Sequence, residues 1–385
     1  MKKKLDYFLS HPIQYISPLL NELAKEIDLN VYYYSDHGIN NKSIDSGFGK
    51  KITWDIPLLN GYNYFFLKNI SWSKKMDCGL LNVINPTIFS VLLKSKSKIV
   101  IVNGWSYSTD LVIILTAWLF RKKVWLRAEN PLHKELTSSK WKRILRNLFL
   151  KYFLFQLVDR FLYIGSESKN YFKHFGVKES KLIFTPYSVD NVKFQNLYQK
   201  NKDRISHLKA ELSLPLDRNV ILFCGKFINV KRPFDILKAF QLLDQEKYAL
   251  ILVGDGPLNA DIQSYIEKEE MKNVFNPGFI NQSEIFKYYT IADVFVLCSQ
   301  METWGLAVNE AINFNLPCVV SNNCGCSFDL IESGKTGYVF ETGNIEQLKT
   351  QIQKAVLIDR SENEIKILEE FSIKTIVDNI KNNIQ

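Results

Sequence analysis

The sequence lacks the features that mark several classes of protein. Its longest uncharged apolar run, Leu111–Phe120, has about ten residues, whereas a membrane-spanning helix needs roughly 18. The six cysteines include no Cys-x-x-Cys pair and have no histidines near them, so a zinc site is not expected. There is no internal repeat and no low-complexity tract. These absences leave a globular protein with reduced thiols, which we expect in the cytoplasm.

The first residues lack the features of a complete signal peptide. Three lysines precede an apolar run that starts at Leu5. His11 and Gln14 interrupt this run, and no small-residue cleavage site follows. We therefore expect a first buried strand here.

Length and composition fit two folded domains. The chain has 385 residues, of which 46% are hydrophobic and 23% are charged, as in ordinary globular proteins. A chain of this length exceeds one typical domain, so two are expected. The formal net charge is +9. Such a charge attracts nucleic acid, anionic membranes and phosphorylated substrates alike, so it does not select among these partners.

Short apolar runs alternate with longer amphipathic ones along the sequence. The strand candidates are 5–9, 29–34, 99–102, 124–127, 161–164, 220–224, 249–253, 274–276, 294–297, 318–321 and 337–340. The helix candidates include 18–26, 141–158, 233–243, 258–270, 282–291, 306–313 and 373–384. This alternation predicts an α/β protein with parallel sheets covered by helices on both faces. The polar stretch 191–218 predicts the linker between its two domains.

Three segments that follow predicted strands of the second half carry candidate binding residues. The first is Gly225-Lys226-Phe-Ile-Asn-Val-Lys231, just before a helix start at Pro233. A glycine admits a ligand close to the backbone and two lysines neutralise phosphate oxygens, so a diphosphate fits here. A solvated basic loop would have the same composition.

The second segment is Gly254-Asp-Gly256-Pro257, a glycine turn after an apolar strand. It lacks the third glycine of a dinucleotide-binding fingerprint, because Asn259 stands there, so a nicotinamide enzyme is not favoured. Its ordinary interpretation is a tight turn, and close approach of the backbone to a ligand is the alternative.

The third segment, Glu302-Thr-Trp-Gly305-Leu306-Ala-Val-Asn-Glu310, joins a predicted strand to a predicted helix. Gly305 and Leu306 open that helix, whose free amides and dipole attract phosphate. Eight residues at helical rise span about 12 Å, so Glu302 and Glu310 can hold hydroxyl groups on either side of a bound diphosphate. Alternatively, Glu302 caps the helix and Glu310 faces water.

These three segments, in this order, resemble the donor-binding half of the family-4 retaining glycosyltransferases, which have two Rossmann-like domains in the GT-B fold. The similarity covers residues 218–350. It implies an α/β GT-B protein whose parallel sheets face each other across a cleft. We expect an acceptor-binding domain over 1–195, a donor-binding domain over 196–365 and a helix over 366–385 that returns to the first domain.

The resemblance also implies roles for single residues. Lys226 and Lys231 would hold the diphosphate, and together with Glu302, which would contact the donor sugar, they are the expected catalytic residues. Lys226 replaces the arginine that is more usual at its position, which keeps the charge but loses a bidentate contact. The other expected donor-binding residues are Gly225 and Gly254 at the turns, Phe279 and Ile280 near the base, Gly305 and Leu306 at the distal phosphate, and Glu310 at the ribose. No cofactor or metal is implied, and the sequence has no Asp-x-Asp triplet.

Fewer residues are indicated in the first half. The segment after the first predicted strand contains His11 and Gln14 and is similar to a subset of these transferases, so both would face the cleft; His11 would otherwise be an ordinary turn residue. Many relatives have a histidine after a middle strand of this domain, where this chain has Arg127-Ala-Glu129. We expect Arg127 or Glu129 to meet the acceptor or the donor sugar.

The segment 138–160 predicts a basic amphipathic helix. Lysines and arginines alternate with large apolar side chains, among them Trp141, Leu145 and Leu148. Either the apolar side packs on a sheet or the helix lies on an anionic membrane, for which its charge is suited.

Together these features predict a retaining, metal-independent glycosyltransferase. It would move a sugar from a nucleoside-diphosphate sugar to a glycan or lipid-linked acceptor, in the synthesis of a surface polysaccharide or glycolipid. Contact with an anionic membrane would bring it to the inner face of the cell membrane. A non-catalytic relative that binds nucleotide sugars is the alternative. Charge alone favours nucleic acid and no recognition motif accompanies it, so no nucleic acid is expected as a partner.

Overall fold

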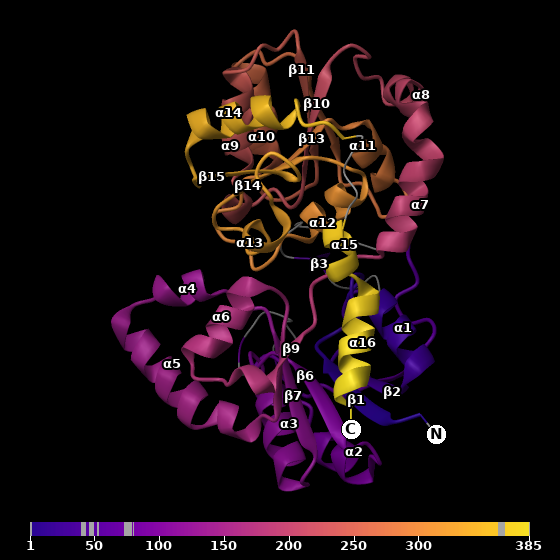
Figure 1. Cartoon of the computed structure of the whole chain (residues 1–385), viewed down its shortest axis with the longest axis vertical. Helices are drawn as coiled ribbons and strands as arrows, with labels where there is room; N and C mark the ends of the chain where they lie inside the picture. The colour runs from indigo at the N-terminus through magenta and orange to yellow at the C-terminus, as the bar shows by residue number, and fades with distance from the viewer. Residues whose placement is uncertain are drawn as a thin grey trace. The chain divides into compact units, whose positions relative to one another are not determined.

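The computed structural model of the chain describes residues 2–39, 44–45, 50–51, 54–72, 79, 81–360 and 366–384. The chain forms two compact units (Figure 1). The first comprises Met1–Ser43, Pro57–Tyr187 and Ile373–Gln385, and the second comprises Ile44–Ile56 and Ser188–Ser372. The domain limits 1–195, 196–365 and 366–385 stay predictions.

The first unit is built on a seven-stranded sheet with the order β5-β2-β1-β6-β7-β8-β9. Its strands, all parallel, are β1 (Lys4–Leu9), β2 (Asp28–Tyr33), β5 (Asn63–Phe66), β6 (Ile99–Asn103), β7 (Lys123–Ala128), β8 (Arg160–Tyr163) and β9 (Leu182–Phe184). The order reverses between β1 and β6, because the chain extends the sheet on one side of β1 before it crosses to the other. At such a switch point the loops after neighbouring strands diverge and leave room for a ligand.

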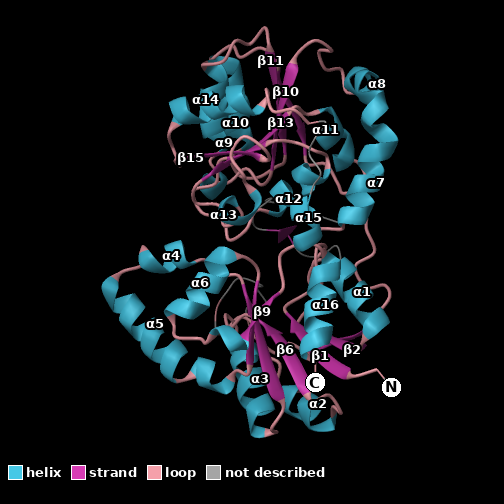
Figure 2. Cartoon of the chain, in the orientation of Figure 1, coloured by secondary structure: helices cyan, strands magenta, loops and turns pink. Residues whose placement is uncertain are grey.

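Helices cover both faces of this sheet (Figure 2). One face packs against α2 (Ile88–Lys94), α3 (Ser108–Leu119) and α6 (Ser166–His174). The other face packs against α1 (Ser17–Glu26) and the last helix, α16 (Ile373–Asn383). Two further helices, α4 (Leu132–Leu136) and α5 (Lys140–Tyr152), follow β7. Among the helices that the structure describes, none has the length and hydropathy of a membrane span.

The second unit is built on a six-stranded sheet with the order β12-β11-β10-β13-β14-β15. Its strands, all parallel, are β10 (Asn219–Cys224), β11 (Tyr248–Val253), β12 (Val274–Gly278), β13 (Val294–Leu297), β14 (Cys318–Ser321) and β15 (Gly337–Phe340). Every residue of β13 and β14 is buried, as expected for strands covered on both faces. The strand order reverses between β10 and β13.

The helices of the second unit are α7 (Asn191–Asn201), α8 (Ile205–Glu211), α9 (Pro233–Gln241), α10 (Asn259–Lys268), α11 (Ile285–Ile291), α12 (Leu306–Asn313), α13 (Ser327–Leu330), α14 (Ile345–Ala355) and α15 (Lys366–Glu370). Helices α9, α10 and α14 share one apolar core with the sheet. The antiparallel strands β3 (Ile44–Asp45) and β4 (Lys50–Lys51) also belong to this unit, although they come early in the sequence.

Each predicted strand is present, and those over 294–297, 318–321 and 337–340 have the predicted ends. The predicted parallel sheets with helices on both faces are confirmed. The linker predicted over 191–218 is wrong, because this stretch forms α7 and α8 within the second unit. Asp190 caps α7 by accepting a hydrogen bond from the Lys193 N–H at 3.0 Å. The polar composition belongs to the outer side of α7, whereas Asn191 and Phe194 are buried.

Candidate active site

The residues predicted in the second half gather at the carboxyl edge of the second sheet. The segment 225–231 follows β10, Gly254 follows β11, Phe279 and Ile280 follow β12, and the segment 302–310 follows β13. These four strands are neighbours, and their order reverses between β10 and β13. The candidates therefore lie at a topological switch point, where open α/β sheets bind ligands.

Two glycines allow the loops after β10 and β11 to meet. A Cβ atom at Gly254 would lie 1.9 Å from the carbonyl oxygen of Gly225, and one at Gly256 would lie 2.6 Å from that of Phe227. The Gly254 N–H donates to the Gly278 carbonyl oxygen at 2.9 Å, which joins the loops after β11 and β12. Close packing of backbone against backbone thus requires the glycine turn.

Lys231 and Glu302 form an ion pair with each other. Their side chains are 21% and 17% exposed, so water screens the pair only in part. The Ser299 hydroxyl lies 3.5 Å from the same carboxylate. Lys231, predicted to bind phosphate, and Glu302, predicted to bind the sugar, thus neutralise each other's charge. Lys226, on the same loop as Lys231, is half-buried.

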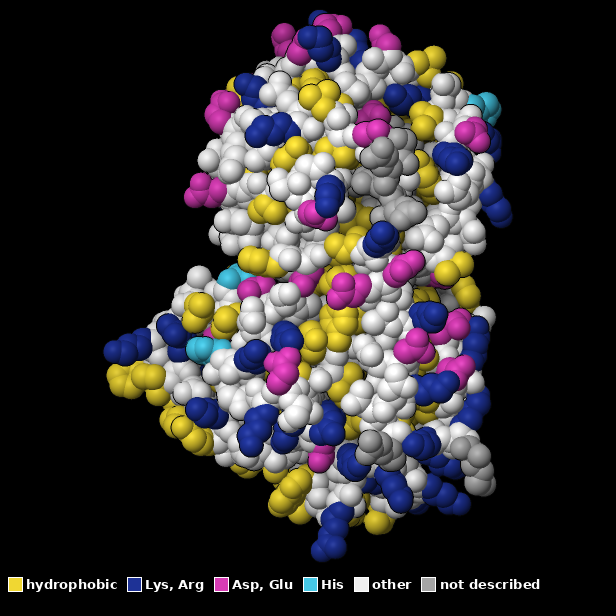
Figure 3. All heavy atoms as spheres, in the orientation of Figure 1, with side chains coloured by type: hydrophobic (Ala, Val, Ile, Leu, Met, Phe, Trp, Pro, Cys, Tyr) yellow, Lys and Arg dark blue, Asp and Glu magenta, His cyan; other side chains and the backbone are white. Residues whose placement is uncertain are grey.

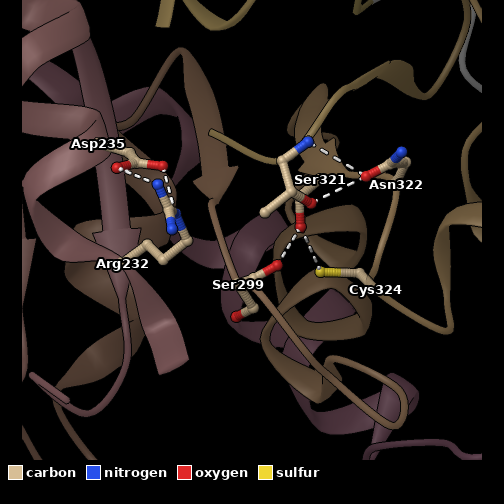
Figure 4. Close-up of polar contacts among 7 residues, drawn as sticks. Arg232, Asp235, Ser299, Ser321, Asn322 and Cys324 are labelled. Carbon is tan, nitrogen blue, oxygen red and sulfur yellow. Dashed lines mark hydrogen bonds and ion pairs between the residues drawn. The ribbon is translucent and has the colours of Figure 1, made fainter. Parts of the chain in front are cut away.

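The neighbouring arginine has a structural task in this loop. Arg232 has a φ of 51°, in the left-handed region, directly before Pro233 opens α9. Its Nε donates to the Asp235 carboxylate at 2.6 Å and its Nη2 donates at 3.1 Å (Figure 4). This bidentate contact closes the turn into α9 and fixes the backbone next to Lys231.

Gly305 begins helix α12 with a φ of +111°, a conformation that favours glycine. A Cβ atom there would lie 3.1 Å from the sulfur of Cys326 and from a methyl group of Leu297. Gly305, the N-cap residue, has no side chain to cap this helix end, and the amides at such an end suit an anion.

Glu310 is half-buried on α12, and two donors hold its carboxylate. The Tyr289 hydroxyl donates at 2.7 Å and the Gln282 amide donates at 3.5 Å. Burial raises the pKa of Glu310, and the hydrogen bond from Tyr289 opposes this rise. Burial also raises the pKa of the Cys224 thiol to about 12, and the nearby Glu310 carboxylate adds to that rise. Glu310 therefore does not simply face water.

The Cys324-Gly325-Cys326 loop supports the segment that carries Glu302. The Ser321 hydroxyl donates to the Ser299 carbonyl oxygen at 2.6 Å and lies 3.3 Å from the sulfur of Cys324 (Figure 4). The Gly325 N–H donates to the Glu302 carbonyl oxygen at 3.0 Å. Both cysteines of the loop are fully buried. Their role is therefore to pack behind the site.

Helix α12 is held by a cluster that the sequence analysis missed. The last residue of the helix, Asn313, donates to Asn191 at 3.0 Å. The Asn191 amide in turn donates to the carbonyl oxygens of Leu368 and Phe371 at 3.0 and 3.1 Å. Trp304 stacks on Phe371 with ring centres 5.4 Å apart. No short motif marks this cluster, because Asn191 lies more than a hundred positions before the residues that it binds.

In the first unit, Arg127 and Glu129 lie at the end of β7 and are linked through Tyr187. The Tyr187 hydroxyl donates to Glu129, and the Arg127 guanidinium lies 4.8 Å from the centre of the Tyr187 ring. Arg127 is 2% exposed, and within the described residues its Nε and Nη1 have no hydrogen-bond partner. The buried hydroxyl of Tyr7 likewise has none there. Buried donors of this kind attract a ligand group rich in acceptor oxygens.

His11 and Gln14 follow β1, at the switch point of the first sheet. Nδ1 of His11 lies 3.0 Å from the Ser10 hydroxyl, and its ring packs edge-on against His37 at 5.4 Å. The side-chain oxygen of Gln14 is buried without a hydrogen-bond partner in the described chain. Tyr15 packs edge-on against Tyr187 at 5.5 Å, so this loop borders the Arg127–Tyr187 cluster.

The basic helix α5 does not pack its apolar side on the sheet. Of its side chains, all of which the structure describes, Leu150 alone is buried. Trp141, Leu145 and Leu148 are 77%, 66% and 54% exposed. Figure 3 shows hydrophobic side chains interspersed with Lys and Arg side chains along the α5 edge of the first unit. The helix carries no acidic residue of its own, although Arg146 forms an ion pair with Glu135 of α4.

A protein-family model described as glycosyl transferases group 1 matches residues 205–367. This range lies within the second unit and contains every donor-site candidate named above.

Two curated relatives differ in how much of their length the chain matches. The chain is 33% identical over 181 residues to sulfoquinovosyl transferase SQD2 of Arabidopsis thaliana, which covers 46% of this chain and 33% of that protein. It is 22% identical over 296 residues to the capsular polysaccharide biosynthesis glycosyltransferase CapM of Staphylococcus aureus, which covers 73% of this chain and 74% of that protein. The chain thus matches one third of the length of the plant enzyme.

A solved structure is similar over the full chain. The crystal structure of Anabaena HepE in complex with UDP and glucose has a TM-score of 0.70 and 17% sequence identity, and the match covers 99% of both chains. At this identity the likeness shows the fold, and the predicted GT-B fold is confirmed.

Proposed function

We propose that the chain, whose residues 205–367 match the model of the glycosyl transferases group 1, is a retaining, metal-independent transferase. Its donor is a nucleoside-diphosphate sugar and its acceptor is a glycan or lipid-linked glycan. The observation that carries the proposal is the position of Lys231, Glu302, the α12 amides and Glu310 at one switch point. Cations and amides there suit a diphosphate, and carboxylates suit hydroxyl groups.

Fixed positive groups suit the departure of a diphosphate. Breaking the bond between the anomeric carbon and the phosphate oxygen leaves positive charge on the sugar and negative charge on the diphosphate. Lys226, Lys231 and the amides at the start of α12 stabilise that negative charge, and the amides, which are fixed by the helix, need little reorganisation. The binding of a phosphate to Lys231 releases Glu302, whose carboxylate then accepts a hydrogen bond from a donor-sugar hydroxyl.

Retention follows if the acceptor attacks from the face that the diphosphate leaves. The acceptor hydroxyl oxygen bonds to the anomeric carbon, the bond to the diphosphate breaks, and the hydroxyl proton passes to the departing phosphate oxygen. No protein nucleophile is required for this route. The anomeric configuration of the product, measured by NMR, tests it: an inverted product contradicts retention.

Donor binding is tested by the unfolding temperature in the presence of UDP-, GDP- and ADP-sugars. We expect one of them to raise it, because a ligand at about 100 times its Kd stabilises the folded state by roughly 2.7 kcal/mol. Glu310→Ala should abolish this rise. If no nucleotide sugar raises the unfolding temperature of the wild type, the proposed donor class is wrong.

A non-catalytic nucleotide-sugar-binding protein is the alternative. It would bind the donor but would not break the bond to the diphosphate. Release of the nucleoside diphosphate from the donor, with water or acceptor present, supports the transferase. Tight donor binding with no release in either case supports the alternative.

The exposed face of α5 supports a peripheral contact with an anionic membrane, where a lipid-linked acceptor would lie. The contact combines apolar insertion by Trp141, Leu145 and Leu148 with attraction between the cations and anionic lipid. We expect sedimentation with vesicles that contain phosphatidylglycerol and not with pure phosphatidylcholine. Replacing the three residues by serine should abolish it. The matched control is serine at Leu216 and Leu357, which are exposed apolar residues of the second unit.

A further inference from the structure

A short segment from the first part of the sequence belongs to the second unit. Residues 44–56 belong to the second unit, whereas the chain before and after them belongs to the first. Beyond the β3–β4 hairpin of this segment, Trp54 and Asp55 contact the rest of the second unit. We call Trp54–Ile56 the strap.

The strap lies against the loop that follows β12. Trp54 packs edge-on against Phe279 with ring centres 6.0 Å apart, and Asp55 accepts a hydrogen bond from the Ser283 N–H at 3.0 Å. Both aromatic rings are half-buried, so part of each remains accessible. The strap thus holds both ends of the segment 279–283.

The same segment contacts the ribose candidate. Gln282, between the two points held by the strap, donates to the Glu310 carboxylate at 3.5 Å. If Glu310 binds a ribose, the base on that ribose lies within the reach of a nucleoside from this loop. A heteroaromatic base gains roughly 1–3 kcal/mol from stacking on an aromatic side chain, with little dependence on its identity.

We propose that Trp54 is a donor-binding residue that forms, with Phe279, an aromatic surface for the nucleobase of the donor. This inference rests on the proposed function. It assigns part of the donor site to a residue that lies about 150 positions before the matched family region, which begins at residue 205.

The test separates the base from the diphosphate. Calorimetry gives the Kd of UDP, GDP, ADP and inorganic pyrophosphate for the wild type, Trp54→Ala and Trp54→Phe. For the nucleotide that the wild type binds best, we expect Trp54→Ala to weaken binding by about tenfold, within the range of one lost stacking contact. Trp54→Phe should restore most of it. Pyrophosphate, which has no base, should bind all three proteins equally.

Trp72 provides the matched control, because it is a fully exposed tryptophan of the first unit. Trp72→Ala should bind the nucleotide as the wild type does. Tryptophan fluorescence gives a second measurement that does not require Trp54→Ala to fold. We expect the nucleotide to quench the emission of Trp72→Phe more than that of Trp54→Phe.

Two results overturn the role of Trp54: wild-type nucleotide affinity in Trp54→Ala, or equal losses of nucleotide and pyrophosphate. If Lys231→Ala still loses nucleotide affinity in that case, the proposed function stands without the strap. If the wild type binds no nucleoside diphosphate, the proposed function fails and the strap proposal fails with it.

Discussion

In both units the strand order of a parallel sheet reverses at one point, and polar side chains gather at the carboxyl ends of the strands there. The two units differ in how these side chains are hydrogen-bonded. In the second unit, Glu302 is paired with Lys231, and Glu310 accepts hydrogen bonds from Tyr289 and Gln282. In the first unit, donors of Arg127 and Tyr7 have no partner among the described residues. A ligand at the second site would therefore exchange these partners, whereas a ligand at the first would supply partners that are lacking.

This difference predicts which substitutions should alter the stability of the protein and which should alter only ligand binding. In the second unit, removing one member of a pair leaves the other half-buried and uncompensated, so both binding and the remaining structure respond. In the first unit, removing an unpartnered donor costs the free protein little and costs the complex a contact.

The largest effect is expected for Lys231→Ala, which should lower turnover about a hundredfold to a thousandfold, as the loss of one fixed group that stabilises transition-state charge does. Steady-state kinetics with the preferred donor measures it. Lys231→Arg keeps the charge and should recover part of the activity. Lys247→Ala, which removes an exposed lysine of the same unit, is the control. Near-wild-type turnover of Lys231→Ala would remove the main support for the donor site.

Arg127→Met tests the first unit, where buried donors lack partners. We expect acceptor-dependent turnover to fall by roughly tenfold to a hundredfold, the value of a lost hydrogen bond to a charged group. The Kd of the donor should stay unchanged. The unfolding temperature should not fall, because the variant removes a buried cation whose Nε and Nη1 lack partners in the described structure. A lower unfolding temperature with unchanged acceptor kinetics would make Arg127 a structural residue.

The pH dependence of donor binding tests Glu310. Its raised pKa means that the carboxylate is lost at a higher pH than that of an ordinary glutamate. Donor affinity should therefore fall as the pH is lowered through that raised pKa and stay constant above it. Glu310→Gln should bind weakly without this fall. Tyr289→Phe removes the hydrogen bond that lowers the pKa, so it should move the midpoint to higher pH. Equal pH profiles in all three proteins would contradict the assignment.

The smallest effect is expected for Asn191→Ala, which removes three buried hydrogen bonds behind α12. The free energy of unfolding should fall by about 1–3 kcal/mol, as for other buried polar groups that lose a partner. Urea denaturation measures it. Asn196→Ala, on the exposed side of the same helix, is the control and should change little.

Much of the fold could be predicted because buried parallel strands such as β13 and β14 are continuous apolar runs. β5 was missed because all four of its residues are exposed, so burial leaves no pattern in the sequence. The stretch 191–218 was mistaken for a linker because its composition reports the solvated side of α7, not the side that carries Asn191 and Phe194.

In the candidate site, too, some residues could be found from the sequence and others could not. Lys231, Glu302, Gly305 and Glu310 lie in two short segments, and the spacing within each segment preserves their geometry. The cluster of Tyr7, Arg127 and Tyr187 comes from three separate parts of the chain, so no spacing indicates it. The pairing of Lys231 with Glu302 was also not predicted, because it joins residues 71 positions apart.

Besides the two crossings that flank residues 44–56, the chain passes between the two units at residues 187–188 and at 372–373. Asn191 lies just beyond the first passage, hydrogen-bonds to Phe371 just before the second, and through Asn313 reaches the far end of α12. One asparagine therefore ties these two covalent connections to helix α12, whose first amides are the proposed phosphate ligands. A ligand at the start of α12 that shifts this helix would therefore strain both connections, and by thermodynamic reciprocity strain in them would change the affinity for that ligand.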